Sequence, residues 1–365
     1  MLRHGRRQPV EGFTALMSTP PPFRVAMTAD FCDAAGQPKY RDIGLDVFDT
    51  HRHIVHGAFA EHRARIGADQ VGDAQGVVVL TAAVTAESVS HAGELLVMAR
   101  FGVGYDSVDV DACTRAHVLV TIARGAVDRP VAEATVGWMI ALGHHLRVKD
   151  QLVRTGQWDA RSRHMGRELR ERTLGVIGLG GIARKLLELL RPFGMNPPLA
   201  YDPALPPGAF AVAGTRSVDL ETLLRHSDFV SLHCPLNEQT RGLIGAHELA
   251  WMRPDAYLIN TARGGIVNED ALFDALREGR IAGAALDCFE EEPVTTPHRF
   301  GTLDNVLLAP HSIAWTDELF RDIGRSACQV MVDLSQGRRP AGVLNPEVFD
   351  SPEFQAKWRR HTHAP

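Results

Sequence analysis

The sequence predicts an α/β fold built from two successive series of buried strands and helices. Short apolar runs without polar alternation suit strands that are buried on both faces of a parallel sheet. The first series has such runs at residues 24–27, 77–80, 95–98 and 118–122, and the second has them at residues 174–177, 199–201, 229–232, 256–259, 284–286 and 306–308. Helical patterns separate the runs, and this alternation is typical of doubly wound parallel sheets.

The composition suits a soluble protein of two domains. The chain has 365 residues, of which 45% are hydrophobic and 23% charged, and its formal net charge is −5. Because a domain takes roughly 100–200 residues, this length suits two domains. No stretch approaches the roughly 18 consecutive apolar residues of a membrane span. No long basic run offers a surface for nucleic acid. We therefore expect neither a membrane nor a nucleic acid as a partner.

The cysteines indicate a reducing compartment. They are scattered, odd in number and form no C-x-x-C pair: Cys32, Cys113, Cys234, Cys288 and Cys328. This pattern favours free thiols in a cytoplasmic protein over a disulfide framework or a zinc knuckle.

The first 22 residues differ from the rest of the chain. They begin with a basic segment and end in three prolines, Pro20 to Pro22. Arg6 and Arg7 are not followed by an apolar segment, which argues against a twin-arginine export signal. We expect residues 1–22 to be a disordered lead, or translation to begin at Met17.

Two longer helices are expected outside the strand series. Asp128 and Pro130 are typical of a helix start, as an N-cap and an early-turn proline. The amphipathic spacing continues through Leu142, and this length suits a helix that bridges two domains or forms a dimer face. A second amphipathic helix is expected beyond Thr316, through Val330.

A glycine-rich loop follows the run at residues 174–177. Gly178, Gly180 and Ala183 form G-x-G-x-x-A between that strand and a predicted helix. These small residues allow a tight turn, a close approach to a pyrophosphate and close packing of helix on strand. Asp202 ends the next strand, where an acid binds ribose hydroxyls and repels a 2′-phosphate. The segment predicts NAD as the cofactor, bound by Gly178, Leu179, Gly180, Gly181, Ile182 and Asp202.

Polar residues follow three later strands, at the edge where open α/β sheets bind ligands. They are Arg263, the glutamates at 290–292 and His311. An arginine fork matches a carboxylate, and a histidine held by an acid can give a proton to a carbonyl oxygen. We therefore expect an arginine, an acid and a histidine to converge for carbonyl chemistry. This reasoning leaves open which glutamate takes part, and each residue alone also fits a surface or loop role.

Several motifs occur in a fixed order along residues 24–345. They are Gly102-Val103-Gly104-Tyr105-Asp106, Val131-Ala132-Glu133, the Gly178 loop, His233-Cys234-Pro235-Leu236, Asn260-Thr261-Ala262-Arg263-Gly264-Gly265, Leu286-Asp287-Cys288-Phe289 and Pro310-His311. With these motifs the sequence resembles the D-isomer-specific 2-hydroxyacid dehydrogenases, such as phosphoglycerate, glycerate and D-lactate dehydrogenases. The resemblance implies hydride transfer between NAD and C2 of a small D-2-hydroxy or 2-oxo acid.

The resemblance also implies the domain organisation. A Rossmann-type doubly wound NAD domain, residues 124–316, would be inserted in a smaller flavodoxin-like α/β substrate domain, residues 23–123 plus 317–350. Family members usually dimerise through the NAD domain, so a homodimer is implied, with the helix from Val131 at that junction.

Residue roles follow from the resemblance. Arg263 would bind the substrate carboxylate and carbonyl, and His311 would be the acid/base. The family's acid directly precedes a proline, which singles out Glu292. Further roles are implied for Asp287 at the nicotinamide carboxamide, the backbone of Val103 and Gly104 at the substrate carboxylate, Trp315 over the substrate side chain, and Cys234, Pro235, Thr240, Thr261 and Ala262 along the cofactor.

Departures and alternatives accompany this assignment. Val127 stands where many members carry asparagine, and the segment after His311 is one residue longer than the common pattern, so Trp315 also fits plain packing. An NAD(H)-sensing corepressor shares this fold, whereas formate dehydrogenases replace the acid found at Glu292 by an amide. A metal site at the histidines of residues 51–62 is a weaker idea, since that segment resembles an exposed helix and no metal is expected.

Overall fold

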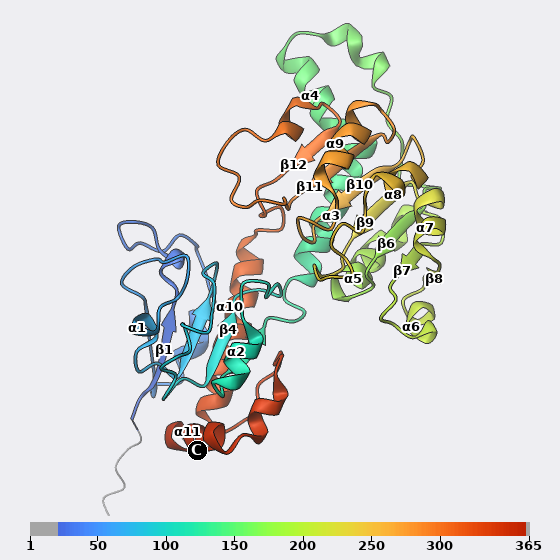
Figure 1. Ribbon diagram of the computed structural model, residues 1–365. Coiled ribbons are helices and arrows are strands. Elements are labelled where there is room, and N and C mark those ends of the chain that lie inside the picture. Colours follow the sequence, from blue (N-terminus) through green and yellow to red (C-terminus); the bar gives the residue numbers. More distant parts are fainter. Residues whose placement is uncertain (1–20, 363–365) are drawn as a thin grey trace, which may run out of the picture.

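Two α/β lobes, each built around a parallel sheet, make up the described part of the chain (Figure 1). The computed structural model describes residues 21–362. The lead expected to be disordered lies outside the described residues, except for its last two. Within residues 21–362, no helix is long and apolar enough to cross a membrane.

The first lobe has five parallel strands in the order β2-β1-β3-β4-β5. They are β1 (Phe23–Met27), β2 (Ile54–Ala58), β3 (Gly76–Val79), β4 (Val97–Arg100) and β5 (Leu119–Ile122). Its first helices are α1 (Ala68–Val71) and α2 (Val110–Arg115). This strand order is that of flavodoxin-like sheets, as expected for the smaller unit. The four predicted strands of this series are confirmed.

Strand β2 was not predicted, and the expectation of an exposed helix around the histidines of residues 51–62 is wrong. β2 is the edge strand, paired along its length with β1. Only Ile54 is buried in it. It therefore lacks the apolar run that marks an inner strand. His56 packs its ring against Phe48, with the ring centroids 5.3 Å apart.

The second lobe has seven parallel strands in the order β8-β7-β6-β9-β10-β11-β12. They are β6 (Leu174–Ile177), β7 (Leu199–Tyr201), β8 (Arg216–Ser217), β9 (Phe229–Leu232), β10 (Tyr257–Asn260), β11 (Gly283–Leu286) and β12 (Val306–Leu308). The order reverses between β6 and β9, the place where doubly wound sheets bind a dinucleotide. The six predicted strands are confirmed, whereas the two exposed residues of β8 gave no signal.

Helices cover both faces of the second sheet. They are α5 (Gly181–Leu190), α6 (Pro207–Val212), α7 (Leu220–His226), α8 (Ala246–Trp251) and α9 (Glu269–Arg277). One buried cluster joins the sheet to α7, α8 and α9, and another joins it to α5 and to α3 (Asp128–Gly143). Because both faces are covered, the strands can be apolar throughout.

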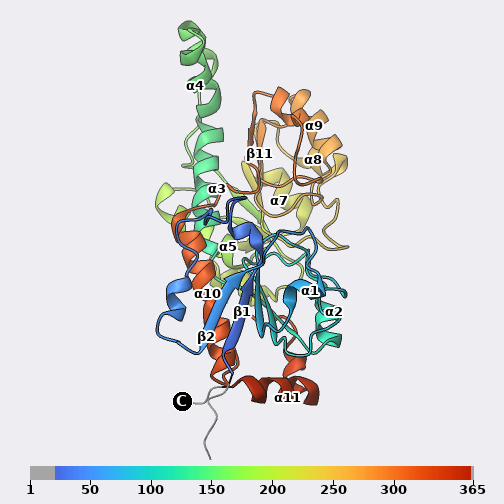
Figure 2. The ribbon, with the colours of Figure 1, turned by 90° about the vertical axis from the view of Figure 1, so that its left-hand side faces the viewer.

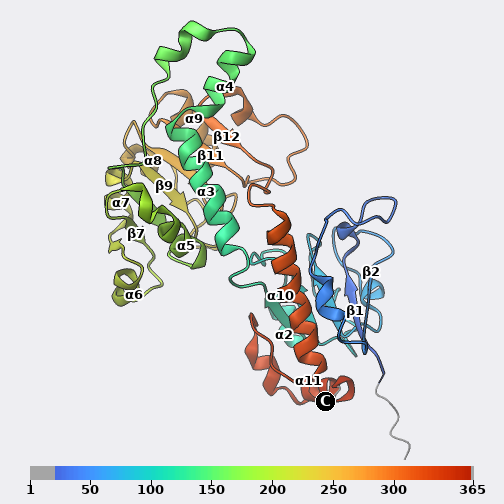
Figure 3. The ribbon, with the colours of Figure 1, turned by 180° about the vertical axis from the view of Figure 1, so that it is seen from behind.

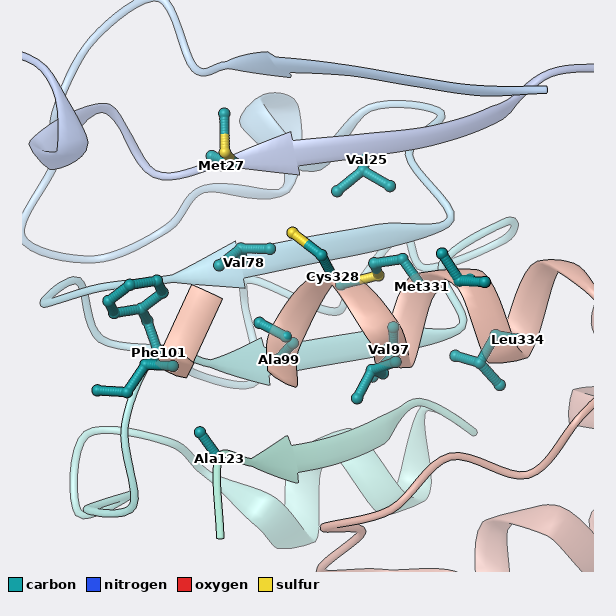
Figure 4. Close-up of a cluster of buried hydrophobic side chains, with 14 of the residues drawn as sticks. Val25, Met27, Val78, Val97, Ala99, Phe101, Ala123, Cys328, Met331 and Leu334 are labelled. Atoms are coloured by element: carbon teal, nitrogen blue, oxygen red, sulfur yellow. The ribbon is translucent and has the colours of Figure 1, made fainter. Parts of the chain in front are cut away.

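Helix α10 (Asp317–Ser335) returns the chain to the first lobe and lies across its sheet (Figure 3). Thr316 caps it by accepting a hydrogen bond from Leu319 N–H at 3.0 Å. Met331 and Leu334 face the strands, as Figure 4 shows. A Cβ on Gly76 would lie 2.2 Å from Met331 Sδ, so the glycine permits this close packing. The helix expected beyond Thr316 is confirmed.

Helix α3 carries the chain from the first lobe to the second, where it packs along α5 (Figure 3). Helix α4 (Leu146–Arg154) then projects away from both lobes (Figure 2). The expectation that Asp128 is the N-cap of α3 is wrong. Val127 holds that position without a side-chain cap, because the Asp128 carboxylate is turned onto Gly181 of α5.

The C-terminal segment also belongs to the first lobe, and it continues beyond residue 350. Helix α11 (Pro352–His361) buries Phe354 and Trp358 in the core that α10 shares with the sheet. Asn345 fastens this segment to β5. Its Oδ1 accepts from Val120 N–H at 2.8 Å, and its Nδ2 donates to Val118 O at 2.9 Å.

We expect Asn345→Ala to lower the free energy of unfolding by about 2–3 kcal/mol, because the buried Val120 N–H and Val118 carbonyl lose their partner. Denaturant unfolding checks this. Asn196→Ala is the matched control. Its side-chain bonds lie at the surface, so a change within about 1 kcal/mol is expected. Equal losses in both variants would contradict the role given to Asn345.

Candidate active site

The glycine loop lies between β6 and α5, at the reversal point of the second sheet. Gly178 has a φ of +88°, and a Cβ there would lie 2.7 Å from Cys234 N. A side chain would therefore meet both backbone strain and a clash. A Cβ on Gly180 would meet nothing within 4 Å, so the loop is open at the N-terminus of α5. Such an open backbone just before a helix suits a pyrophosphate, because the free N–H groups at the helix N-terminus can bind its oxygens.

Asp202 completes the loop from the neighbouring strand. It follows β7, and its Oδ2 accepts a hydrogen bond from Leu179 N–H at 2.8 Å. Its Oδ1 accepts from Ala204 N–H at 3.1 Å. The carboxylate therefore lies against the glycine loop, where it can accept from ribose hydroxyls and repels a 2′-phosphate. The residues present fit NAD.

His311 and Glu292 form a direct hydrogen-bonded pair at the ends of β12 and β11. His311 Nδ1 lies 2.7 Å from Glu292 Oε2, and Glu292 Oε1 accepts from Phe289 N–H at 2.9 Å. Both carboxylate oxygens are thus engaged, and the imidazole keeps Nε2 for a substrate. Among the three successive glutamates, the structure places Glu292 against the histidine, whereas Glu290 accepts from Glu269 N–H.

The surroundings keep Glu292 ionised. Burial acts to raise its pKa, but the hydrogen bonds from His311 and from the Phe289 backbone act against burial. The positive charges of His311 and Arg263 add to this effect, and the pKa of Glu292 lies below its ordinary value. A charged carboxylate on Nδ1 orients the imidazole and stabilises its protonated form.

Arg263 reaches from the loop after β10 to the first lobe. Its Nε donates to Asp106 Oδ2 at 2.7 Å, and its Nη1 donates to Ala262 O at 2.7 Å. A Cβ on Gly104 would lie 1.3 Å from Arg263 Nη2, so the guanidinium rests directly on the Gly104 backbone. The structure thereby brings Arg263 to the loop that was expected to hold the substrate carboxylate.

Two supporting residues lay inside the recognised motifs but had no role assigned. Asp106 ends the Gly102 motif and pairs with Arg263 across the lobes. Asn260 donates through Nδ2 to Arg263 O at 2.8 Å and accepts from Ala262 N–H at 3.0 Å. In the sequence, the only indication of these contacts was that Asp106 and Asn260 are polar residues in glycine-containing motifs.

Asp287 shapes the segment that carries His311. Its Oδ1 accepts from the N–H groups of Ser312 at 2.8 Å and Ile313 at 3.1 Å. Its carbonyl accepts from His311 N–H at 2.8 Å, which supports the left-handed φ of +53° at the histidine. Burial raises the pKa of Asp287 to about 6, against the effect of the two backbone donors.

Comparison with known proteins shows the family of this chain. The model of the D-isomer specific 2-hydroxyacid dehydrogenase NAD-binding domain matches residues 136–312. The glyoxylate reductase of Thermococcus litoralis is 36% identical over 281 residues, which are 75% of this chain and 84% of that protein. The chain belongs to the D-isomer-specific 2-hydroxyacid dehydrogenase family. Its cofactor is NAD, and its family indicates NAD-dependent 2-hydroxyacid dehydrogenase activity.

Further relatives of this dehydrogenase differ in length or share mainly the fold. The D-3-phosphoglycerate dehydrogenase of Methanocaldococcus jannaschii is 38% identical over 279 residues, 76% of this chain and 53% of that protein. This chain therefore spans about half the length of that relative. The solved TT0316 protein of Thermus thermophilus has a TM-score of 0.75 and 27% identity, and the match covers 88% of this chain and 99% of that one.

The other residues expected along NAD in this dehydrogenase lie on two neighbouring loops. Cys234 follows β9 beside Gly178, and burial raises the pKa of its thiol to about 11. Thr240 Oγ donates to Pro235 O at 2.6 Å and closes that loop. On the loop after β10, the Ala262 carbonyl already accepts from Arg263, while Thr261 Oγ is buried and has no partner among the described residues.

Trp315 lies on the turn after His311 and is 52% exposed. Its ring centroid is 5.8 Å from that of Tyr40 and 5.1 Å from that of Phe320, both in edge contacts. The backbone N–H of Trp315 donates to Ser312 O at 2.9 Å, so the segment with the expected extra residue forms a compact turn. The indole thus joins the His311 segment to the first lobe.

In residues 21–362, the one group of three histidine, cysteine or acidic residues with metal-ligand spacing is Cys288, Glu292 and His311, within 4.8 Å of one another. Glu292 and His311 are already bonded to each other at 2.7 Å. Burial raises the pKa of the Cys288 thiol, which donates to Ala262 O at 3.4 Å. All three groups therefore already have hydrogen-bond partners within the protein.

We expect Gly178→Ala to weaken NADH binding at least about ten-fold, because the new Cβ adds strain and meets the Cys234 backbone. Quenching of protein fluorescence by NADH measures this. Gly214→Ala is the control, because Gly214 also has a positive φ, +69°, but a Cβ there meets nothing within 4 Å. If both variants bound NADH like the parent protein, the assignment of the loop would fail.

Proposed function

We propose that this dehydrogenase transfers a hydride between NAD and C2 of a small D-2-hydroxy or 2-oxo acid, with Arg263, Glu292 and His311 as its catalytic residues. The observation that carries the proposal is the 2.7 Å bond between His311 and Glu292, in the same site as an arginine that rests on Gly104. The relatives' names, glyoxylate reductase and D-3-phosphoglycerate dehydrogenase, support a small acid as the substrate.

Proton transfer is the role of His311. When bound, the reduced cofactor NADH would supply the hydride for C2 in the direction of reduction, and oxidised NAD would accept it in the reverse direction. His311 Nε2 donates its proton to the carbonyl oxygen, and it accepts the hydroxyl proton in the reverse direction. Glu292, bonded to Nδ1, keeps the ring oriented and stabilises the imidazolium that precedes donation.

Arg263 positions the acid. Its Nε and Nη1 are engaged by Asp106 and Ala262, so the guanidinium plane is fixed, and Nη2 lies at the Gly104 backbone. A substrate carboxylate bound at Val103 and Gly104 would meet this Nη2 and the loop's amide groups. Fixed donors of this kind also polarise the carbonyl without reorganising during the reaction.

Assembly and location belong to the same proposal. Helix α4 and the turn after it expose large apolar side chains, with Val153 at 65%, Trp158 at 63% and Met165 at 77% exposed. Burying them against a second copy would form a homodimer through the NAD-binding lobe. Free cysteines suit the cytoplasm.

The proposed domain division assigns one sheet to each domain. Residues 124–316 are the NAD domain, and residues 23–123 with the C-terminal segment are the substrate domain.

The overall test is NADH oxidation, followed by absorbance, with a panel of 2-oxo acids and His311→Ala as the control. Oxidation that requires both the acid and His311 supports the proposal. Bound NADH without turnover on any acid would overturn it and would favour a sensor of NAD(H).

We expect Glu292→Gln to move the pH dependence of reduction. The parent carboxylate is ionised throughout the neutral range, and its negative charge favours the protonated imidazole. Glu292→Gln removes this charge, so the protonated imidazole loses its stabilising partner. The pH above which kcat/KM for the 2-oxo acid falls should therefore move down, by about one unit or more. Glu291→Gln, at the exposed neighbour, should leave the profile in place, and a matching shift there would contradict the assignment.

We expect Arg263→Ala to reduce kcat/KM at least about 100-fold, because both the carboxylate anchor and the carbonyl-polarising donor are lost. Steady-state kinetics measures this, with NADH binding as a check on folding. Arg241→Ala, at an arginine on the exposed loop after β9, should stay near the parent value. Full turnover by Arg263→Ala would refute the anchor role.

A further inference from the structure

A second polar cluster lies at the carboxyl end of the first sheet, outside the catalytic set. Asp30 follows β1, Thr81 follows β3 and Arg100 ends β4. Asp30 Oδ2 accepts from Thr81 N–H at 2.9 Å and also from the Thr81 hydroxyl. Because β1, β3 and β4 are parallel neighbours, these side chains share one edge of the sheet.

The hydrogen bonding of this cluster is incomplete. Asp30 is only 8% exposed, and its Oδ1 has no hydrogen-bond partner within the described residues. Arg100 Nε is also buried and unpaired there, although Arg100 Nη1 donates to Phe101 O. A buried carboxylate oxygen and a buried guanidinium N–H are costly without partners. The cluster therefore lacks one acceptor for Arg100 and one donor for Asp30.

The cluster borders two segments to which the proposed function gives a part in substrate binding. On one side, a Cβ on Gly102 would lie 3.2 Å from Arg100 Nη1. Gly104, two residues later, is in contact with the Arg263 guanidinium. On the other side, burial and the nearby Asp30 charge both raise the pKa of Tyr40. The Tyr40 ring contacts Trp315, four residues after His311.

We propose that Asp30, Thr81 and Arg100 form the subsite for the C3 group of the substrate, and that this subsite takes an uncharged, hydroxyl-bearing group. This inference rests on the proposed function. A hydroxyl is both a donor and an acceptor, so it can supply the donor that Asp30 Oδ1 lacks and the acceptor that Arg100 Nε lacks. An alkyl group leaves both atoms unpaired, and sites built to bind a hydroxyl discriminate strongly against analogues that lack it.

The charges of the site disfavour a phosphate. Arg100 and Arg263 are balanced by Asp30 and Asp106, and Arg263 is already bonded to Asp106. Once the carboxylate of a substrate is bound, no positive charge remains in surplus among these four residues. A phosphate monoester would add roughly two negative charges beside the Asp30 carboxylate. The structure thus favours the unphosphorylated acid over its phosphate ester.

The test compares kcat/KM for four 2-oxo acids: glyoxylate, which has no C3, and pyruvate, hydroxypyruvate and phosphohydroxypyruvate, which differ only in the substituent on C3. We expect hydroxypyruvate to exceed both pyruvate and phosphohydroxypyruvate by about ten-fold or more. Asp30→Asn removes the charge but keeps the shape, so the ratio of phosphohydroxypyruvate to hydroxypyruvate should rise at least about ten-fold. Asp33→Asn, at an exposed aspartate on the following turn, should leave that ratio unchanged.

The outcomes separate the two proposals. A preference of the parent protein for pyruvate or for phosphohydroxypyruvate overturns the subsite, even if glyoxylate is reduced. An unchanged ratio in Asp30→Asn that still binds NADH also overturns it. Failure to reduce any of the four acids overturns the proposed function itself.

Discussion

The ion pair between Arg263 and Asp106 holds together the two halves of the active site. Arg263 belongs to the carboxyl edge of the second sheet, and Asp106 belongs to the loop after β4 of the first. This 2.7 Å contact, together with the contacts of Trp315 with Tyr40 and Phe320, fixes the Gly104 loop relative to the His311–Glu292 pair. The Arg263 side chain is 25% exposed and the Asp106 side chain 49%, so solvent screens this pair in part. The same guanidinium serves the fold and, under our proposal, the substrate.

Parallel strands explain why so many functional side chains meet without being close in sequence. In each sheet, every strand ends at the same edge, and the loops there carry Gly178, Arg263, Glu292 and His311 in the second lobe. The first lobe contributes Gly104 from the loop after β4. Helices α3 and α10 join the lobes so that these two edges face one another (Figure 1). The site is therefore a consequence of strand direction and of two connecting helices.

The inner strands, the glycine loop and the three residues after strand ends could be predicted from sequence, because burial and backbone geometry leave local signatures. Edge strands β2 and β8 could not, because their exposed residues lack an apolar run. The contact of Asp128 with Gly181 reversed a local rule, since a long-range approach outweighed helix capping. The cluster around Asp30 could not be predicted either, because it forms only when the fold brings Asp30 near Thr81 and Arg100, which are distant in sequence.

Two carboxyl groups flank His311, and their surroundings shift their pKa values in opposite directions. Hydrogen bonds and positive charges lower the pKa of Glu292, so it remains a full negative charge on Nδ1. Burial raises the pKa of Asp287 to about 6, although its Oδ1 is bonded by two backbone N–H groups. The two carboxylates also bind different parts of the histidine segment. Asp287 accepts from the backbone N–H groups that follow His311, whereas Glu292 is bonded to the imidazole itself. One carboxylate thus fixes the backbone that carries the acid/base, and the other orients its ring and stabilises its protonated form.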